Sequence, residues 1–210
     1  MKCVIIGGAD IKNYTRTASY IKKEDYIIFC DSGLFHKEGL RLSPSLIVGD
    51  FDSYDKDLSE WETKENVEVI RLPKEKDDTD SFYAIKEGLK RGFDEFVLLG
   101  MVGNRFDHSF VNVAALLYLH NHGKSAVLVD DYCKMEVVDG EVTITDDCEF
   151  FSLLNISGEE NEISIENAKF PLIHGSITPE YQYAVSNEVL PGKTAKITLH
   201  KGRVLLVRDF

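Results

Sequence analysis

The sequence predicts two domains of different fold class: an α/β domain with a mainly parallel sheet over residues 1–130, and an all-β sandwich over residues 131–210. Two observations predict this division. In the first part, short apolar runs alternate with stretches of helical periodicity, which is typical of a parallel sheet covered by helices. In the second part, brief alternating runs are separated by Gly, Asp, Asn and Pro, which is typical of antiparallel strands.

The first domain contains six apolar runs that we interpret as buried strands, because strands covered on both faces are apolar throughout. A helix is expected after Thr79 and Asp80, either of which can cap it, and ends at Gly92. A second helix begins near Asp107 and ends at Gly123. The expected strands are 3–6, 26–30, 46–48, 67–72, 96–99 and 126–129.

In the second domain we expect six strands and no substantial helix. Asp139-Gly140, between two of the runs, is a favourable hairpin turn. The expected strands are 134–138, 141–145, 149–154, 162–165, 195–199 and 204–207.

The composition limits the partners of the chain. Its formal net charge of -12 repels polyanions, so we expect neither nucleic acid nor a membrane surface as a partner. An anionic substrate then requires metal ions or well-placed cations. No apolar segment approaches membrane-spanning length, and the first residues lead straight into a strand, so a cytoplasmic location is expected.

Ligands of parallel α/β sheets bind beyond the carboxyl ends of the strands. In this sequence the loops that follow the expected strands carry glycines and carboxylates, which would gather at one edge of the sheet. The loops are 7–10, 31–33, 49–53, 74–80 and 100–108.

Asp50 and Asp52 are two residues apart, so on an extended segment their side chains point the same way, and Gly49 allows a close backbone approach. Two such carboxylates favour a bound cation, and Mg²⁺ fits because it prefers hard oxygen ligands. The alternative is that both simply solvate a loop.

Asp77 and Asp80 can share one face of the first helical turn, although one of them can equally be a cap, and Lys76 beside them can meet a phosphate. Further along, Arg105 suits phosphate oxygens, and Asp107 and His108 open a helix whose positive end favours an anion. Arg105 can instead pair with a neighbouring aspartate.

Three motifs, together with Asp31-Ser32-Gly33 and Ser186-Asn187-Glu188, resemble the thiamine pyrophosphokinase family in their order and spacing. This resemblance implies an α/β catalytic domain that binds ATP and metal, a β-sandwich for thiamine binding and dimerisation, and a homodimer with thiamine between the two kinds of domain. The motifs are 49–53, 76–80 and 103–108.

The resemblance also implies roles for individual residues. Asp50, Asp52, Asp77 and Asp80 would be catalytic, and Asp50, Asp52 and Asp80 would hold magnesium. Thiamine would lie near Thr79, Ser186 and Asn187. The residues expected near ATP are Asp31, Ser32, Lys76, Arg105, Asp107 and His108.

The function expected from the resemblance is transfer of pyrophosphate from ATP to the hydroxyl of thiamine, with AMP released and an aspartate such as Asp80 taking the proton. Such transfer needs alignment and charge neutralisation more than a protein nucleophile. Two alternatives share the acidic rim: a metal-dependent hydrolase of nucleotides or phosphate esters, and a non-catalytic sensor of a nucleotide or vitamin.

Overall fold

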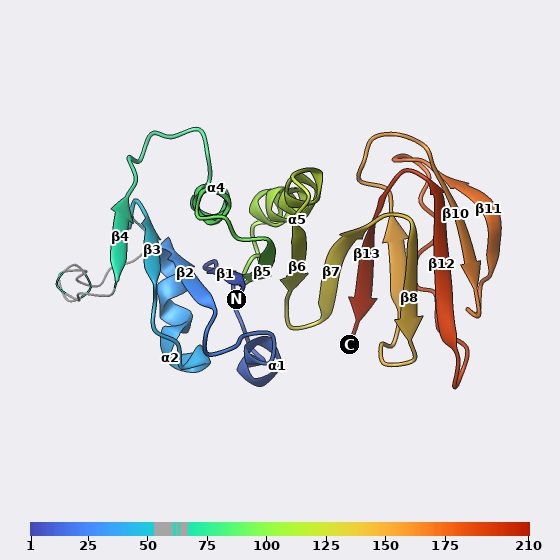
Figure 1. Cartoon of the computed structure of the whole chain (residues 1–210), viewed down its shortest axis with the longest axis horizontal. Helices are drawn as coiled ribbons and strands as arrows, with labels where there is room; N and C mark the ends of the chain where they lie inside the picture. Colours follow the sequence, from blue (N-terminus) through green and yellow to red (C-terminus); the bar gives the residue numbers. More distant parts are fainter. Residues whose placement is uncertain (53–60, 62, 64–66) are drawn as a thin grey trace. The chain divides into compact units, whose positions relative to one another are not determined.

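The computed structural model describes residues 1–52, 61, 63 and 67–210. The chain forms two compact units, Met1–Asp131 and Tyr132–Phe210 (Figure 1). Ser53, the last residue of the loop 49–53, lies outside the described residues.

Within the first unit, six strands of described residues form a sheet in the order β4-β3-β2-β1-β5-β6. Neighbouring strands in this sheet are parallel, which confirms the predicted α/β class. The four residues of β1 are fully buried, which explains why its sequence is an unbroken apolar run. The strands are β1 (Cys3–Ile6), β2 (Tyr26–Cys30), β3 (Leu46–Gly49), β4 (Glu68–Arg71), β5 (Glu95–Leu99) and β6 (Ser125–Val129).

Helices cover both faces of this sheet (Figure 1). The two predicted helices are α4 (Asp80–Lys90) and α5 (Phe106–Asn121). Gly88 brings α4 close to the sheet, because a Cβ there would lie 2.6 Å from the Phe96 ring. The opposite face packs around Val4 and Ile6. Three short elements, α1 (Tyr14–Ala18), the 3₁₀ helix η1 (Asp31–His36) and α2 (Lys37–Leu40), were not predicted, since such short helices show no clear periodicity.

The second unit is all-β, as predicted. Its strands form two antiparallel sets, β7-β13-β9 and β11-β10-β12-β8. Ile144, Phe151, Ile163 and Leu206, which come from both sets, belong to one core in which each of these side chains is fully buried. The two sets therefore pack face to face. The strands are β7 (Cys133–Val138), β8 (Glu141–Thr145), β9 (Phe151–Leu154), β10 (Asn161–Glu166), β11 (Leu172–Ile177), β12 (Thr194–Lys201) and β13 (Val204–Asp209).

Two details of this unit differ from the prediction. The Asp139-Gly140 turn was expected to close a hairpin, but β7 pairs with β13 and β8 pairs with β12, so the turn connects the two sheets. The strand β11 was not predicted. It contains Gly175, and His174 has a positive φ of 49°, so the usual alternation is interrupted.

Among the described residues, the structure contains no helix with the length and apolar character needed to cross a membrane.

The core of the second unit can be tested with two isoleucines of β11. Ile177 is fully buried, whereas Ile173 is 83% exposed. Ile177→Ala should lower the free energy of unfolding by about 2–5 kcal/mol, since it leaves a cavity. The matched control Ile173→Ala should cost less than about 1 kcal/mol. Urea unfolding of both variants measures the difference, and equal losses would contradict the described packing.

Candidate active site

The loops after β1 and β5 lie against each other at the carboxyl end of the sheet. The Gly7 amide donates to the Leu99 carbonyl at 2.8 Å, and the Ala9 amide donates to the Gly100 carbonyl at 3.0 Å. A Cβ on Gly100, whose φ is 61°, would lie 2.5 Å from the Gly7 carbonyl oxygen. These glycines therefore serve close contact between two backbones.

The loop after β2 fits into the same assembly. A Cβ on Gly33 would lie 2.2 Å from the Ile6 carbonyl oxygen, and one on Gly8 would lie 2.0 Å from Ser32 Oγ. Asp31 is buried and has a φ of 44°, and a Cβ on Gly49 would lie 3.0 Å from its Cβ. Asp31-Ser32-Gly33, expected to be a loop, is the first turn of η1. Because these glycines have no side chains, the carboxyl ends of β1, β2, β3 and β5 can lie close together.

His36 fastens η1 to the loop after β1. Its Nε2 lies 2.9 Å from the Ala9 carbonyl oxygen, and its Nδ1 lies 2.8 Å from the Tyr14 hydroxyl. The neutral ring satisfies both contacts when Nε2 donates and Nδ1 accepts. Burial lowers the pKa of His36 below 6.5, although the hydrogen bond to Ala9 acts in the opposite direction.

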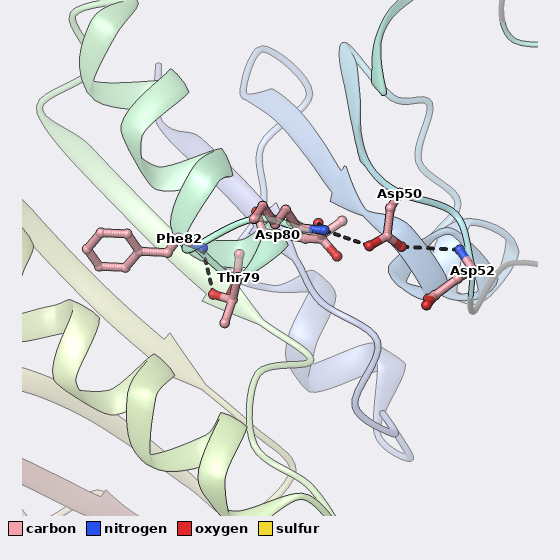
Figure 2. A network of polar contacts seen from close by, with 8 residues as sticks. Asp50, Asp52, Thr79, Asp80 and Phe82 are labelled. Atoms are coloured by element: carbon pink, nitrogen blue, oxygen red, sulfur yellow. Dashed lines mark hydrogen bonds and ion pairs between the residues drawn. The ribbon is translucent and has the colours of Figure 1, made fainter. Parts of the chain in front are cut away.

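Three carboxylates converge at this edge. Oxygen atoms of Asp31, Asp50 and Asp52 all lie within 4.8 Å of one another. The sequence prediction correctly paired Asp50 with Asp52 but assumed an extended segment. Phe51 has a φ of 61°, and the bent backbone places the Asp52 amide 3.3 Å from Asp50 Oδ1 (Figure 2). The convergence therefore comes from a turn, and it includes Asp31.

Lys76 lies between Asp50 and Asp80. Its Nζ is 2.7 Å from Asp50 Oδ2 and 3.0 Å from Asp80 Oδ1. The hydrogen bond from Lys76 lowers the pKa of Asp50. Burial opposes the charge of Lys76, but the two carboxylates outweigh it and raise the pKa of this lysine. Burial raises the pKa of Asp80, against the effect of Lys76. The carboxylates at β3 and α4 are thus joined by one ammonium group.

Thr79 is the residue that caps α4. Its Oγ1 accepts a hydrogen bond from the Phe82 amide at 3.2 Å (Figure 2). Asp77 precedes this cap and is exposed, so it does not share a helical face with Asp80, which is the first residue of α4. Of these two aspartates, Asp80 is the one that Lys76 joins to Asp50. We call the group of Asp31, Asp50, Asp52, Lys76 and Asp80 the acidic edge.

The start of α5 carries an exposed ion pair. Arg105 Nη2 lies 2.6 Å from Asp107 Oδ2, which is the pairing considered as an alternative to phosphate binding. His108 is exposed beside them. Ser109, which is buried, fixes the preceding loop: its Oγ accepts from the Gly103 amide at 3.0 Å and lies 2.9 Å from the Arg105 carbonyl oxygen. The loop backbone is therefore held while the charged side chains face solvent.

In the second unit, Ser186 is exposed with a φ of 53°, and its amide donates to Ser152 Oγ at 3.0 Å. Asn187 is buried. Its Nδ2 donates to the Phe170 carbonyl at 2.8 Å, and its Oδ1 accepts from the amides of Phe170 and Glu188, each at 3.0 Å. The Asn187 side chain thus holds the local backbone together.

Sequence reasoning missed three contributions. Asp31 was expected near ATP, and its place beside Asp50 and Asp52, which follows because β2 and β3 are neighbours, was not foreseen. Its position directly after a strand was the available signal. Ser109 and His36 hold their loops through hydrogen bonds that the spacing of residues along the sequence does not predict.

A parallel α/β sheet with carboxylates and a lysine at the carboxyl ends of its strands is typical of enzymes that act on phosphates. Residues 17–128 match the family model described as thiamin pyrophosphokinase, catalytic domain. The match covers more than half of the chain, and the chain therefore belongs to the thiamin pyrophosphokinase family. Its activity is that of the family, transfer of pyrophosphate from ATP to thiamine.

Solved structures share the fold over the whole chain. Thiamine pyrophosphokinase from Bacillus subtilis is 22% identical with a TM-score of 0.87, and 99% of that chain is covered. The enzyme from Geobacillus thermodenitrificans is 23% identical with a TM-score of 0.84 over 98% of its chain. Yeast thiamin pyrophosphokinase is 14% identical with a TM-score of 0.77 over 86% of its chain. No curated protein matches this sequence closely enough to count as a relative.

The neutral His36 ring makes stability depend on pH. The folded-state pKa of His36 is lowered, so the unfolded chain binds the proton at a higher pH than the folded chain does. The contribution of His36 to the free energy of unfolding is therefore complete above pH 6.5 and is lost as pH falls from 6.5 toward the folded-state pKa. The slope from one such group is at most about 1.4 kcal/mol per pH unit. His36→Gln should be less stable at pH 8 but have a flatter slope below pH 6.5. Urea unfolding at several pH values checks this, and identical slopes would disprove it.

Proposed function

We propose that the chain performs this transfer at a magnesium site on the acidic edge of the first unit. The observation that supports the proposal is the convergence of Asp31, Asp50 and Asp52 within 4.8 Å, beside the ion pairs that join Lys76 to Asp50 and Asp80. Three carboxylates so close repel one another unless a cation lies among them. Their hard oxygen atoms fit Mg²⁺, which also keeps positions for water and phosphate.

Asp50, Asp52 and Asp80 are the proposed ligands from the family motifs, and the geometry adds Asp31 to them. Bound magnesium would neutralise charge on the phosphates of ATP. The aspartates would hold it at the carboxyl ends of β2 and β3 and at the start of α4. An aspartate of this group, such as Asp80, is proposed to take the proton of the thiamine hydroxyl.

The remaining residues would bind and orient the substrates. Lys76 and Arg105 are proposed to contact phosphate oxygens, which for Arg105 requires exchange of its exposed partner Asp107 for the nucleotide. Ser32 and His108 are proposed to lie near ATP as well.

Thiamine is proposed to lie near Thr79, Ser186 and Asn187, and Asp77 is proposed to lie close to the reacting substrates. Thr79 and Asn187 are already committed to backbone contacts, so each would act mainly by holding its neighbours in place. Ser186, which is exposed, would face the vitamin directly.

We further propose that the second unit binds thiamine and joins two chains into a homodimer. Several large apolar side chains that are exposed in this unit support the proposal, since burying them on association would remove apolar surface from water. The exposed side chains are Phe170, Ile173, Tyr181, Tyr183 and Val185. A cytoplasmic site of action is part of the same proposal, because ATP is available there and each of the four cysteines is a thiol.

The reaction itself is tested by its products. With thiamine, ATP and Mg²⁺, the expected products are thiamine diphosphate and AMP in equal amounts, which chromatography separates. Formation of ADP, or release of AMP and pyrophosphate without a need for thiamine, would overturn the proposal in favour of a different kinase or a hydrolase. Removal of Mg²⁺ with a chelator should stop the reaction, and its return should restore it.

Asp52→Ala tests the acidic edge. Loss of a proposed metal ligand should lower kcat by at least about 100-fold, since even residues that only support a ligand contribute 10–100-fold. The free energy of unfolding should change by less than about 1 kcal/mol, because Asp52 is exposed.

Asp94→Asn is the matched control for Asp52→Ala. Asp94 precedes β5 at the opposite edge of the sheet and pairs with Lys124 at 2.6 Å. Its replacement should leave turnover unchanged. Normal turnover in Asp52→Ala would remove this residue from the proposed site.

A further inference from the structure

The ammonium of Lys76 occupies a partly enclosed position between two carboxylates. The side chains of Lys76, Asp50 and Asp80 are 16%, 11% and 23% exposed, so the charges are largely removed from bulk water. Pairs of this kind interact more strongly than pairs at the open surface. Nζ lies 2.7 Å from one carboxylate and 3.0 Å from the other.

The position matters because the oxygen atoms of Asp50 have different partners. Oδ1 lies 3.3 Å from the Asp52 amide, and Oδ2 receives Lys76. An ion that joined Asp80 to Asp50 through Oδ2 would therefore use the oxygen, and the space, that Nζ uses now. The oxygen atoms of Asp31, Asp50 and Asp52 converge with Lys76 in place, whereas a metal ion bound to Asp50 Oδ2 and Asp80 Oδ1 would have to displace Nζ.

We propose that Lys76 is a tethered competitor of the metal: its ammonium holds the cation position between Asp50 and Asp80 and moves to the phosphates when metal and nucleotide bind together. This inference rests on the proposed magnesium site. A compact ammonium on a flexible four-carbon stem is suited to such exchange. Lysine and metal oppose each other while both face only carboxylates. Once a triphosphate is present, both can contact phosphate oxygens and support binding together.

This exchange predicts that Lys76 weakens metal binding in the absence of nucleotide and strengthens it in the presence of nucleotide. Without nucleotide, Lys76 weakens metal binding, so Lys76→Met should bind Mn²⁺ about five- to tenfold more tightly than the wild type, within the usual range of coupling between two sites. With the non-transferable analogue α,β-methylene-ATP present, the same variant should bind the Mn²⁺-analogue complex more weakly than the wild type. A lysine that only contacts phosphate would leave the first titration unchanged. A lysine that only supports the fold would weaken both.

The experiment measures free Mn²⁺ by electron paramagnetic resonance as each full-length protein is titrated. Lys86→Met is the matched control, since Lys86 pairs with Asp78 at 2.6 Å on the neighbouring turn and should leave Mn²⁺ affinity at the wild-type value. Lys76→Gln is the second variant, because its amide can still donate to Asp50 if Lys76→Met does not fold. Circular dichroism establishes folding before each titration.

The inference is overturned if the folded Lys76 variants bind Mn²⁺ no more tightly than the wild type in the absence of nucleotide, including the case in which none of the proteins binds it. It is equally overturned if the analogue titration shows no loss of affinity. The proposed function is judged separately, by whether the wild type forms thiamine diphosphate and AMP, so failure of one is distinguishable from failure of the other.

Discussion

Electrostatic repulsion among carboxylates is the constraint that organises the first unit. Asp31, Asp50 and Asp52 are held within 4.8 Å of one another, and Asp80 is joined to them through Lys76. In a chain of net charge -12, three carboxylates repel one another, so the backbone must hold them close together. The proposed magnesium ion would relieve this repulsion on binding.

The glycines supply that backbone control. A Cβ at Gly8 or Gly33 would clash with its neighbours and one at Gly49 would be tightly packed, so the strand ends approach more closely than larger residues would allow. Asp31 and Phe51 occupy left-handed backbone conformations at the two points where carboxylates must turn inward. His36 and Ser109 then fasten the outer loops by hydrogen bonds. The packed strand ends and hydrogen-bonded loops thus fix the backbone that carries the charged side chains of the site.

Much of this could be predicted, and the failures have physical reasons. Strands such as β1 were found because burial on both faces makes a short strand wholly apolar. The closeness of the Asp50 and Asp52 carboxylates could be predicted because their spacing and the flanking Gly49 are local features. The partnership of Asp31 with them depends on β2 lying beside β3, which spacing along the chain does not encode. The Asp139-Gly140 turn was assigned to a hairpin for the same reason: turn chemistry shows that a chain reverses but not which strands pair. The family assignment agrees with the ordered motifs, while the roles of single residues remain proposals.

The pairing of β13 has a consequence for synthesis on the ribosome. Val204–Asp209 pairs with β7 on one side and with β9 on the other, so Asp209 stands opposite Cys133. The first strand of the second unit must therefore wait for the last one to emerge before the β7-β13-β9 set can close. Pairings of such long range form slowly because loop-closure entropy opposes them. The parallel sheet of the first unit has no such dependence, since all its strands precede residue 130. A growing chain would therefore carry the complete parallel sheet of the first unit while strands of the second unit are still unpaired, and unpaired strands favour aggregation.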